Sequence, residues 1–157
     1  MLQKDLALLI GPALETAVLL NRYPKSVIEI FLLVLEVEGD ISSMAITCSS
    51  VALADAGIEM YDLVASCSTV KTDDGLVVDP SRADLEQQTG YVLTALMPTR
   101  GEITALSQSG MWDGEVLQQG IDLTLEGARQ IHLLMRQALC EGLSKELPEG
   151  TADAMVQ

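Results

Sequence analysis

The spacing of hydrophobic residues changes near residue 24. Up to that point apolar residues recur every three or four positions, which predicts one buried face of a helix. The residues of this face are Leu2, Leu6, Leu9, Ala13, Ala17 and Leu20. Pro12 lies inside the run, and we expect a kink or a restart there because proline cannot donate a backbone N–H. After a turn predicted at residues 23–26, residues 27–37 are almost continuously apolar and predict a strand buried on both faces.

A second helix is predicted to follow this strand. Ser42 or Ser43 is the expected N-terminal cap, and the helix should run to about Ala56, with Gly57 in the left-handed position that ends many helices. Many of its residues are alanine or serine. Side chains of this size allow a helix to approach a sheet closely.

Two hairpins are predicted after the second helix. Residues 60–70 and 76–78 flank an Asp-Gly pair, which is a hairpin signal. Residues 91–97 and 102–106 form the second pair of apolar runs. Between the hairpins, residues 80–88 are polar and predict a loop with one helical turn.

A long helix is predicted at the C-terminal end. Asp113 is the expected N-cap, and Trp112 and Leu117 are placed to form a hydrophobic staple across it. The apolar positions that define its buried face are Leu117, Ile121, Leu125, Ala128, Ile131, Met135, Ala138 and Leu139. The helical pattern ends near Leu147, and residues 148–157 are expected to form a disordered tail.

The order of elements indicates an α+β protein. Helix, strand, helix, two hairpins and helix place both parallel and antiparallel strands in one mixed sheet packed with helices. The length of 157 residues suits one domain, expected over residues 1–147.

Composition argues against an independent nucleic-acid binder. The chain carries 23 acidic and 9 basic residues, a net charge of -14, whereas binding to a phosphate backbone depends on lysine and arginine. Aromatic residues make up 3% of the chain and offer few surfaces on which bases could stack. We therefore expect RNA contact only through a local basic patch or through a partner protein.

Cysteine usage and hydropathy bear on the compartment. Cys48, Cys67 and Cys140 form no CxxC pair, and we interpret them as reduced core thiols of a cytosolic or nuclear protein. The longest wholly apolar run is residues 30–35, far shorter than a membrane span, so no membrane association is expected.

Several short blocks, in order, resemble the RNase PH family. The strongest is residues 52–64, Ala-Leu-Ala-Asp-Ala-Gly-Ile-Glu-Met-Tyr-Asp-Leu-Val, which looks like the passage from a small-residue helix into a core strand in that family. The other blocks are the turn at residues 21–26, the strand end at 77–80, the hairpin at 96–104 and Ser109-Gly110 before the last helix. The resemblance covers about residues 4–145 and is nearest to the non-catalytic ring subunits of the RNA exosome.

The resemblance implies a fold and a set of partners. The expected fold is a partial RNase PH domain, of the type also seen in ribosomal protein S5 domain 2. The expected partners are other RNase PH-like subunits, in a heterodimer within a hexameric ring, together with a cap subunit. RNA would be met indirectly, through the ring channel. Such subunits serve rRNA processing and mRNA decay in the nucleus, the nucleolus and the cytoplasm.

The resemblance also implies that catalysis is lost. Phosphorolytic relatives bind inorganic phosphate with an arginine at the start of the small-residue helix, and Ser42 stands at that position here, next to Asp40. Helix capping is the alternative role for these residues. Active relatives also carry spaced carboxylates for a divalent metal, but Ser81 replaces one of them and residues 89–94 contain no acid. We therefore assign no catalytic, cofactor or metal residue, and no cofactor.

Other acidic residues have plain structural interpretations. Asp79, Asp84 and Glu86 are expected to be solvated loop carboxylates. Glu36, Glu38 and Asp40 could collect a cation but are better explained as an acidic strand end that faces solvent or a basic partner.

The remaining candidates also lack a functional pattern. His132 has no Cys or His at ligand spacing and is interpreted as a structural or surface residue. Gly110 and Gly114 do not make a nucleotide loop, because no strand–GxGxxG–helix pattern surrounds them. Arg22, Lys25 and Arg100 could contact RNA or a neighbour, and the sequence leaves that open.

Two alternatives to a ring subunit remain open. The first is an active phosphorolytic 3′-exoribonuclease of the RNase PH type. The second follows from length. Family members usually carry a long additional N-terminal segment, so the expected domain lacks its N-terminal portion and the chain looks like a fragment or a short isoform. The alternative is a truncated isoform that binds the usual partner but cannot complete the ring. Whether the chain is a fragment or a short isoform, a partial domain should leave a sheet edge unprotected and part of the core uncovered.

Overall fold

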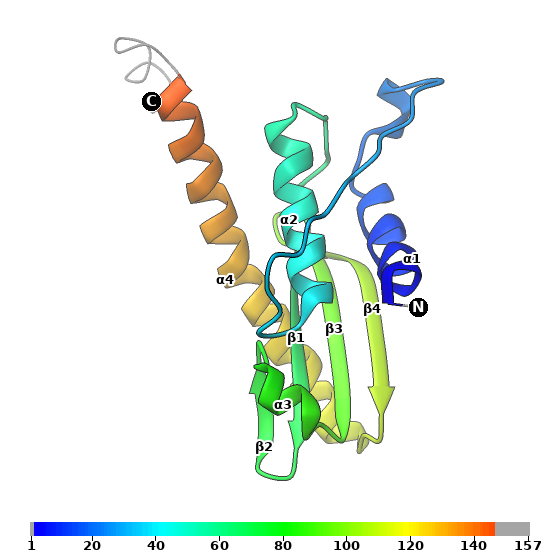
Figure 1. Cartoon of the computed structure of the whole chain (residues 1–157), viewed down its shortest axis with the longest axis vertical. Helices are drawn as coiled ribbons and strands as arrows, with labels where there is room; N and C mark the ends of the chain where they lie inside the picture. The colour runs from blue at the N-terminus through cyan, green and yellow to red at the C-terminus, as the bar shows by residue number, and fades with distance from the viewer. Residues whose placement is uncertain (1, 147–157) are drawn as a thin grey trace.

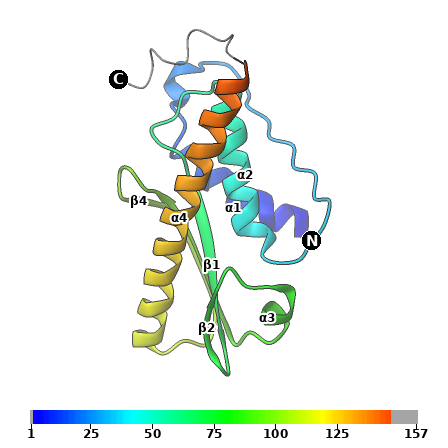
Figure 2. The ribbon, with the colours of Figure 1, turned by 90° about the vertical axis from the view of Figure 1, so that its left-hand side faces the viewer.

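The computed structural model describes residues 2–146 and consists of a four-stranded sheet between two helical layers. Figure 2 shows the sheet nearly edge-on, with α4 (Gly114–Glu146) on one side and α1 (Leu2–Glu15) and α2 (Ile41–Asp55) on the other. The α+β class is therefore confirmed. The predicted tail, residues 148–157, lies outside the described residues.

The sheet is antiparallel throughout the described chain. Its strands are β1 (Ala65–Thr72), β2 (Gly75–Val78), β3 (Gly90–Met97) and β4 (Glu102–Gly110), in the order β2-β1-β3-β4. Both predicted hairpins are confirmed: β1 pairs with β2 and β3 with β4. The expected parallel strand is not part of this sheet, so the prediction of a mixed sheet is wrong.

The central strand β3 is buried on both faces. Tyr91, Leu93, Ala95 and Met97 pack in the core with α1 and α2, whereas Leu96 belongs to the core beneath α4. This alternation follows from the two-residue period of a strand. Two hydrophobic cores therefore lie on opposite sides of one strand, and both stabilise its position.

The helices largely match their predicted limits. Of the kink or restart predicted at Pro12, the restart is wrong, because α1 continues through this residue. In α2 the C-terminal signal is confirmed, because Gly57 has a positive φ of 72°. The cap of α2 is Asp40, whose side chain accepts hydrogen bonds from Ser42 N and Ser43 N, and the prediction of Ser42 or Ser43 as the cap is wrong. A short helix α3 (Arg82–Glu86) is the single helical turn expected between the hairpins.

The long helix α4 buries a stripe that differs slightly from the predicted one. Ala128 and Met135 are buried as expected, but Ala138 is exposed, and Thr124 and His132 are buried although the pattern did not include them. Leu20, predicted on the buried face of the first helix, is 51% exposed because α1 ends before it. No helix among the described residues is long and apolar enough to cross a membrane.

The largest departure from prediction is the segment at residues 27–37. Figure 1 shows it as an extended chain that crosses in front of α2, and no strand pairing is found for it within the described residues. Phe31 and Leu35 are 87% and 88% exposed, so the prediction of a strand buried on both faces is wrong for this chain. The segment is apolar, as the sequence shows, but burial also requires neighbouring strands. We call residues 27–37 the extended segment.

Candidate functional site

Three segments meet at the N-terminus of α2. They are residues 38–43, the loop after β2, and the start of β3. Gly39 forms a bridge with Ser81, and Arg82 N donates to Glu38 O at 2.7 Å. A Cβ on Gly39 would lie 2.9 Å from the Pro80 carbonyl oxygen, so this close approach requires glycine. These contacts hold the chain just after the extended segment against the loop that follows β2.

A buried carboxylate occupies the helix N-terminus itself. Asp40 is 8% exposed, and its carboxylate accepts hydrogen bonds from Ser42 N at 3.1 Å and Ser43 N at 3.3 Å. The Tyr91 hydroxyl donates to the same carboxylate at 2.8 Å. These residues, Asp40, Ser42, Ser43 and Tyr91, are called the Asp40 cluster. Exposed N–H groups and the helix dipole make this position an anion site, and here the chain supplies the anion.

The electrostatics of the Asp40 cluster favour a protonated tyrosine. Burial, and then the negative charge of Asp40, raise the pKa of Tyr91 far above its ordinary value. The phenol therefore remains a hydrogen-bond donor to the carboxylate at any physiological pH, and the pair locks α2 onto β3.

The acidic residues predicted to lie in loops do not gather into a site. Asp84 is held by Ser81 in a capping box that starts α3, with Ser81 Oγ 2.6 Å from Asp84 Oδ2, and these hydrogen bonds lower the pKa of Asp84. Glu86 pairs with Arg82 at 3.3 Å. Asp79 is exposed in a left-handed conformation, with a φ of 52°. As expected, these carboxylates are taken up by solvent or by local partners. Asp79 and Glu86 are exposed, and Asp84 is held in its cap.

The structure also places the other predicted candidates apart. Glu36 and Glu38 are exposed, whereas Asp40 turns inward to cap α2, so these residues do not converge on a cation. Across the residues that the structure describes, no three His, Cys, Asp or Glu side chains are grouped as they would be to hold a metal ion. Gly110 ends β4 and Gly114 begins α4, which is a strand-to-helix connection without a glycine-rich loop between them.

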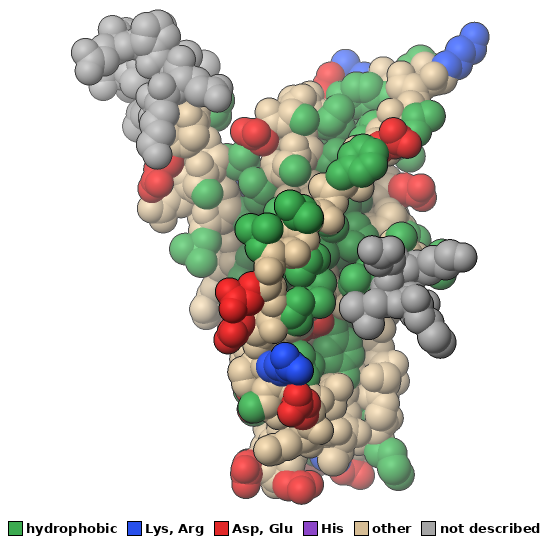
Figure 3. Space-filling model, viewed as in Figure 1, with side chains coloured by type: hydrophobic (Ala, Val, Ile, Leu, Met, Phe, Trp, Pro, Cys, Tyr) green, Lys and Arg blue, Asp and Glu red, His purple; other side chains and the backbone are tan. Residues whose placement is uncertain are grey.

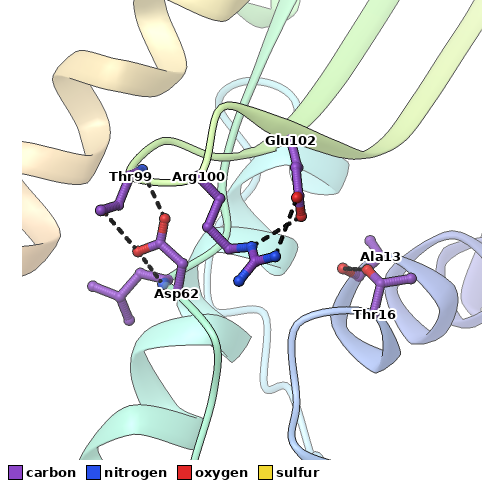
Figure 4. Close-up of polar contacts among 7 residues, drawn as sticks. Ala13, Thr16, Asp62, Thr99, Arg100 and Glu102 are labelled. Carbon is purple, nitrogen blue, oxygen red and sulfur yellow. Dashed lines mark hydrogen bonds and ion pairs between the residues drawn. The ribbon is translucent and has the colours of Figure 1, made fainter.

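A second polar centre surrounds Asp62. Its carboxylate accepts from Thr99 N at 2.7 Å and from Thr99 Oγ1 at 3.1 Å, and it lies 3.8 Å from His132 Nε2. Figure 4 shows Asp62 reaching the tip of the β3–β4 hairpin, next to Arg100 and Glu102. His132 is 6% exposed. His132 therefore has a structural position, on the buried side of α4, where it helps to join the hairpin to the helix.

The three basic candidates differ in how far they are engaged. Arg100 makes two hydrogen bonds to Glu102, at 3.0 and 3.2 Å, and its guanidinium lies 5.1 Å from the centre of the Tyr61 ring. Arg22 pairs with Glu59 at 3.6 Å. Lys25 is exposed in a left-handed turn conformation, with a φ of 63°. Acidic partners thus balance two of these charges, and contact with RNA stays a prediction for all three.

The cysteine prediction is confirmed only for Cys67. Burial, and then the charge of Asp79, raise the pKa of the Cys67 thiol, so it stays protonated in the core beneath α4. Cys48 and Cys140 lie on exposed faces of α2 and α4, so their assignment to the core is wrong.

The functional feature that sequence reasoning missed is the Asp40–Tyr91 hydrogen bond. Asp40 directly precedes Ile41, and aspartate is among the best N-caps, so the cap itself had a local signal. Its partner lies 51 positions away. No spacing pattern connects residues that far apart, and only the fold reveals the pair.

Comparison with known proteins identifies the family. Residues 2–59 match domain 1, and residues 62–127 match domain 2, of the 3′ exoribonuclease family, RNase PH. The chain is 33% identical to the exosome complex component RRP41-like of Arabidopsis thaliana over 141 residues, which is 90% of this chain and 55% of that protein. It is 35% identical to the human exosome complex component MTR3 over 143 residues, covering 87% of this chain and 52% of that protein.

A further relative and a solved structure agree with this family match. The exosome complex component Rrp41 of Thermococcus gammatolerans is 33% identical over 149 residues, covering 95% of this chain and 60% of that protein. The crystal structure of rice (Oryza sativa) Rrp46 matches with a TM-score of 0.80 at 21% identity, covering 88% of this chain and 65% of that chain, and shows the same fold. The chain spans just over half the length of the curated relatives it matches. It belongs to the RNase PH family of 3′ exoribonuclease domains.

Proposed function

We propose that this chain is a non-catalytic structural subunit of an exosome ring and supports 3′-to-5′ RNA processing and degradation. Its relatives are named exosome complex components, of both the Rrp41 and the MTR3 type, at 33% and 35% identity. In this role it would pair with other RNase PH-like subunits, carry a cap subunit, and meet RNA through the channel that they enclose.

The Asp40 cluster is the observation that supports a non-catalytic role. By resemblance, phosphorolytic relatives bind inorganic phosphate at the start of this helix. Here the same backbone N–H groups already bind the Asp40 carboxylate, and Tyr91 closes the site from the side of β3. A phosphate ion would have to displace a buried carboxylate and would meet its negative charge. The repulsion between two neighbouring negative charges is strong in a desolvated site.

The arrangement of the acidic residues near the site also supports the proposal. Metal-assisted phosphorolysis needs carboxylates that converge on one cation. Asp84 is fixed in its cap and Glu86 pairs with Arg82. Residues 89–94 contain no acid, and the side chain among them that reaches the Asp40 carboxylate is Tyr91.

An architectural role agrees with the charge and surface of the chain. A net charge of -14 suits docking against more basic neighbours, and many large apolar side chains are exposed, among them Leu133 and Leu134 on α4 at 66% each. Permanent assemblies bury more than about 2,000 Å² of mainly apolar surface. The cell compartments that we propose are those of the exosome: the nucleus with its nucleolus, and the cytoplasm.

A phosphorolysis assay tests the non-catalytic half of this proposal. The purified chain without partners is incubated with labelled single-stranded RNA, inorganic phosphate and Mg²⁺. We expect no release of nucleoside diphosphates. Release that requires phosphate would contradict the proposal, and Asp79→Asn would then test whether that exposed carboxylate takes part. That substitution is a suitable control because asparagine tolerates the left-handed conformation of residue 79, which limits the damage to folding.

A further inference from the structure

A small pocket lies between the tip of the β3–β4 hairpin and the middle of α4. Its volume is about 290 Å³. Pro98 and Thr99 line it from the hairpin, and Glu126, His132 and Leu133 are among the residues that line it from α4. The carboxylate of Asp62 contacts both sides, through Thr99 and His132. The pocket therefore lies at a junction that the fold itself holds together.

Part of the pocket lining is a buried imidazole without a hydrogen bond. His132 is 6% exposed, and its Nε2 atom lies 3.8 Å from Asp62 Oδ1, which is beyond hydrogen-bond range. Within residues 2–146, no hydrogen bond to the side chain of His132 is found. Nearly all buried polar side chains have a partner, so a buried imidazole beside an open pocket points to a ligand that completes it.

The position of Asp62 indicates which kind of hydrogen bond is missing. In a neutral imidazole one ring nitrogen carries a proton and the other is an acceptor. The carboxylate beside Nε2 of His132 favours the proton on that nitrogen. The second ring nitrogen is then an acceptor that lacks a donor. A group that completes the pocket should therefore bring N–H or O–H donors.

The charge around the pocket favours a cation. Glu126 lines the pocket with an exposed carboxylate, and Asp62 lies beside His132. Arg129 also lines the pocket, but its guanidinium already pairs with Glu126 at 3.5 Å. The whole chain has a net charge of -14, and on the face drawn in Figure 3 acidic side chains are more widespread than basic ones. A field of this sign attracts cations and repels anions.

The apolar part of the lining suits a long basic side chain. Pro98 is partly buried and Leu133 is exposed. Lysine and arginine pack their methylene stems on such surfaces and keep their charged heads among polar groups. Arginine has five N–H donors in one plane, so its guanidinium can reach an imidazole nitrogen and a carboxylate together, whereas the lysine ammonium acts as a point charge.

We propose that this pocket receives an arginine side chain of a partner polypeptide. The guanidinium donates to the unprotonated ring nitrogen of His132 and to the Glu126 carboxylate, and the methylene stem lies along Pro98 and Leu133. The inference goes beyond the proposed function, because it concerns a pocket of the chain alone and does not require a complete ring.

Nuclear magnetic resonance tests the pocket directly, because His132 is the single histidine of the chain and its imidazole signal is unique. The full isotope-labelled chain is titrated with an end-blocked peptide that carries one arginine between glycines. The matched control carries citrulline, which has the shape of arginine without its charge. We expect saturable shifts of the His132 imidazole and Thr99 amide signals, with a Kd on the order of 1 mM, and roughly tenfold weaker binding of the citrulline peptide.

Variants on α4 separate the pocket from general attraction. Glu126→Gln should weaken binding of the arginine peptide by roughly threefold, whereas Glu115→Gln, which removes an exposed carboxylate from the first turn of α4, should change it little. Arg129→Gln should strengthen binding by roughly twofold, because it frees Glu126.

A variant of the imidazole tests its role as an acceptor. His132→Phe should weaken binding of the arginine peptide by roughly fivefold, read from the Thr99 amide signal, since a phenyl ring accepts no such hydrogen bond. Circular dichroism checks that this variant folds. The variants of exposed residues keep the proposal testable if it does not.

Several results would overturn the proposal. A His132 signal that neither peptide shifts would mean that the pocket holds water alone. Equal binding of both peptides, or equal effects of Glu126→Gln and Glu115→Gln, would contradict an arginine site. Weaker binding in Arg129→Gln would show that the pocket takes an anion instead. Because the assay uses the chain alone, it can fail while the ring assignment holds, and it can succeed while the ring assignment fails.

Discussion

Removing the Asp40 carboxylate should destabilise the fold strongly, because two interactions depend on it. Loss of an N-cap costs about 1 kcal/mol. The Tyr91 hydroxyl would also lose a hydrogen bond to a charged group, worth about 1.5–3 kcal/mol. Relief of some repulsion in a chain of net charge -14 offsets part of this cost. For Asp40→Ala we therefore expect a loss of about 2–4 kcal/mol in the free energy of unfolding.

Matched variants resolve this loss into its parts. Asp40→Asn keeps an oxygen acceptor but loses the charge, and should cost about 1–2 kcal/mol. Combining Asp40→Asn with Tyr91→Phe should show a coupling energy of about 1 kcal/mol in a double-mutant cycle. Asp122→Ala is the control: the residue is exposed on α4, and surface changes stay within about 0.5 kcal/mol.

Urea denaturation followed by circular dichroism measures these free energies. If Asp40→Ala costs no more than Asp122→Ala, or if Asp40 and Tyr91 do not couple, the Asp40 cluster does not hold α2 to β3. In that case Asp40 would also not be held firmly enough to fill the phosphate position.

Three further predictions concern pH, packing and the hairpin. In the folded chain the pKa of Tyr91 is raised above its ordinary value of 10.0, so the unfolded chain releases this proton first as the pH rises. Stability should therefore fall as the pH rises past 10.0, and it should fall less in Tyr91→Phe. Thermal melts across pH test this. A Cβ at Gly127 would lie 2.7 Å from Cys67 Sγ, so Gly127→Ala should cost about 1–3 kcal/mol, and less in a Cys67→Ala background, as measured by urea denaturation. Asp62→Ala should speed hydrogen exchange of the Thr99 amide by roughly tenfold or more, since that amide loses its acceptor, and unchanged exchange would contradict the role given to Asp62.

Elements with local signals were predictable from the sequence. The β1–β2 hairpin is predictable because an Asp-Gly pair separates two apolar runs. The end of α2 is predictable because glycine readily adopts the left-handed conformation that follows many helices, and Gly57 has a φ of 72°. The long helix α4 was found from its three-to-four spacing. In each case the residues that determine the structure lie close together in the chain.

Features that depend on distant partners were not predictable. The extended segment has the composition of a buried strand, but a strand is buried only if other strands and helices cover it, and its own residues do not reveal whether they do. The Asp40–Tyr91 pair joins positions 51 residues apart, and the Asp62 contacts with Thr99 and His132 join three separate elements. Periodicity locates the faces of an element, whereas tertiary packing decides which faces meet.

Native mass spectrometry of the tagged chain, purified from its own cells, tests the central claim most directly. If the chain is a structural ring subunit, it should be recovered in a complex whose mass equals a ring of RNase PH-like subunits with their cap proteins, at one copy per ring. Recovery of the bare chain, or of a complex without any other RNase PH-like subunit, would contradict this account.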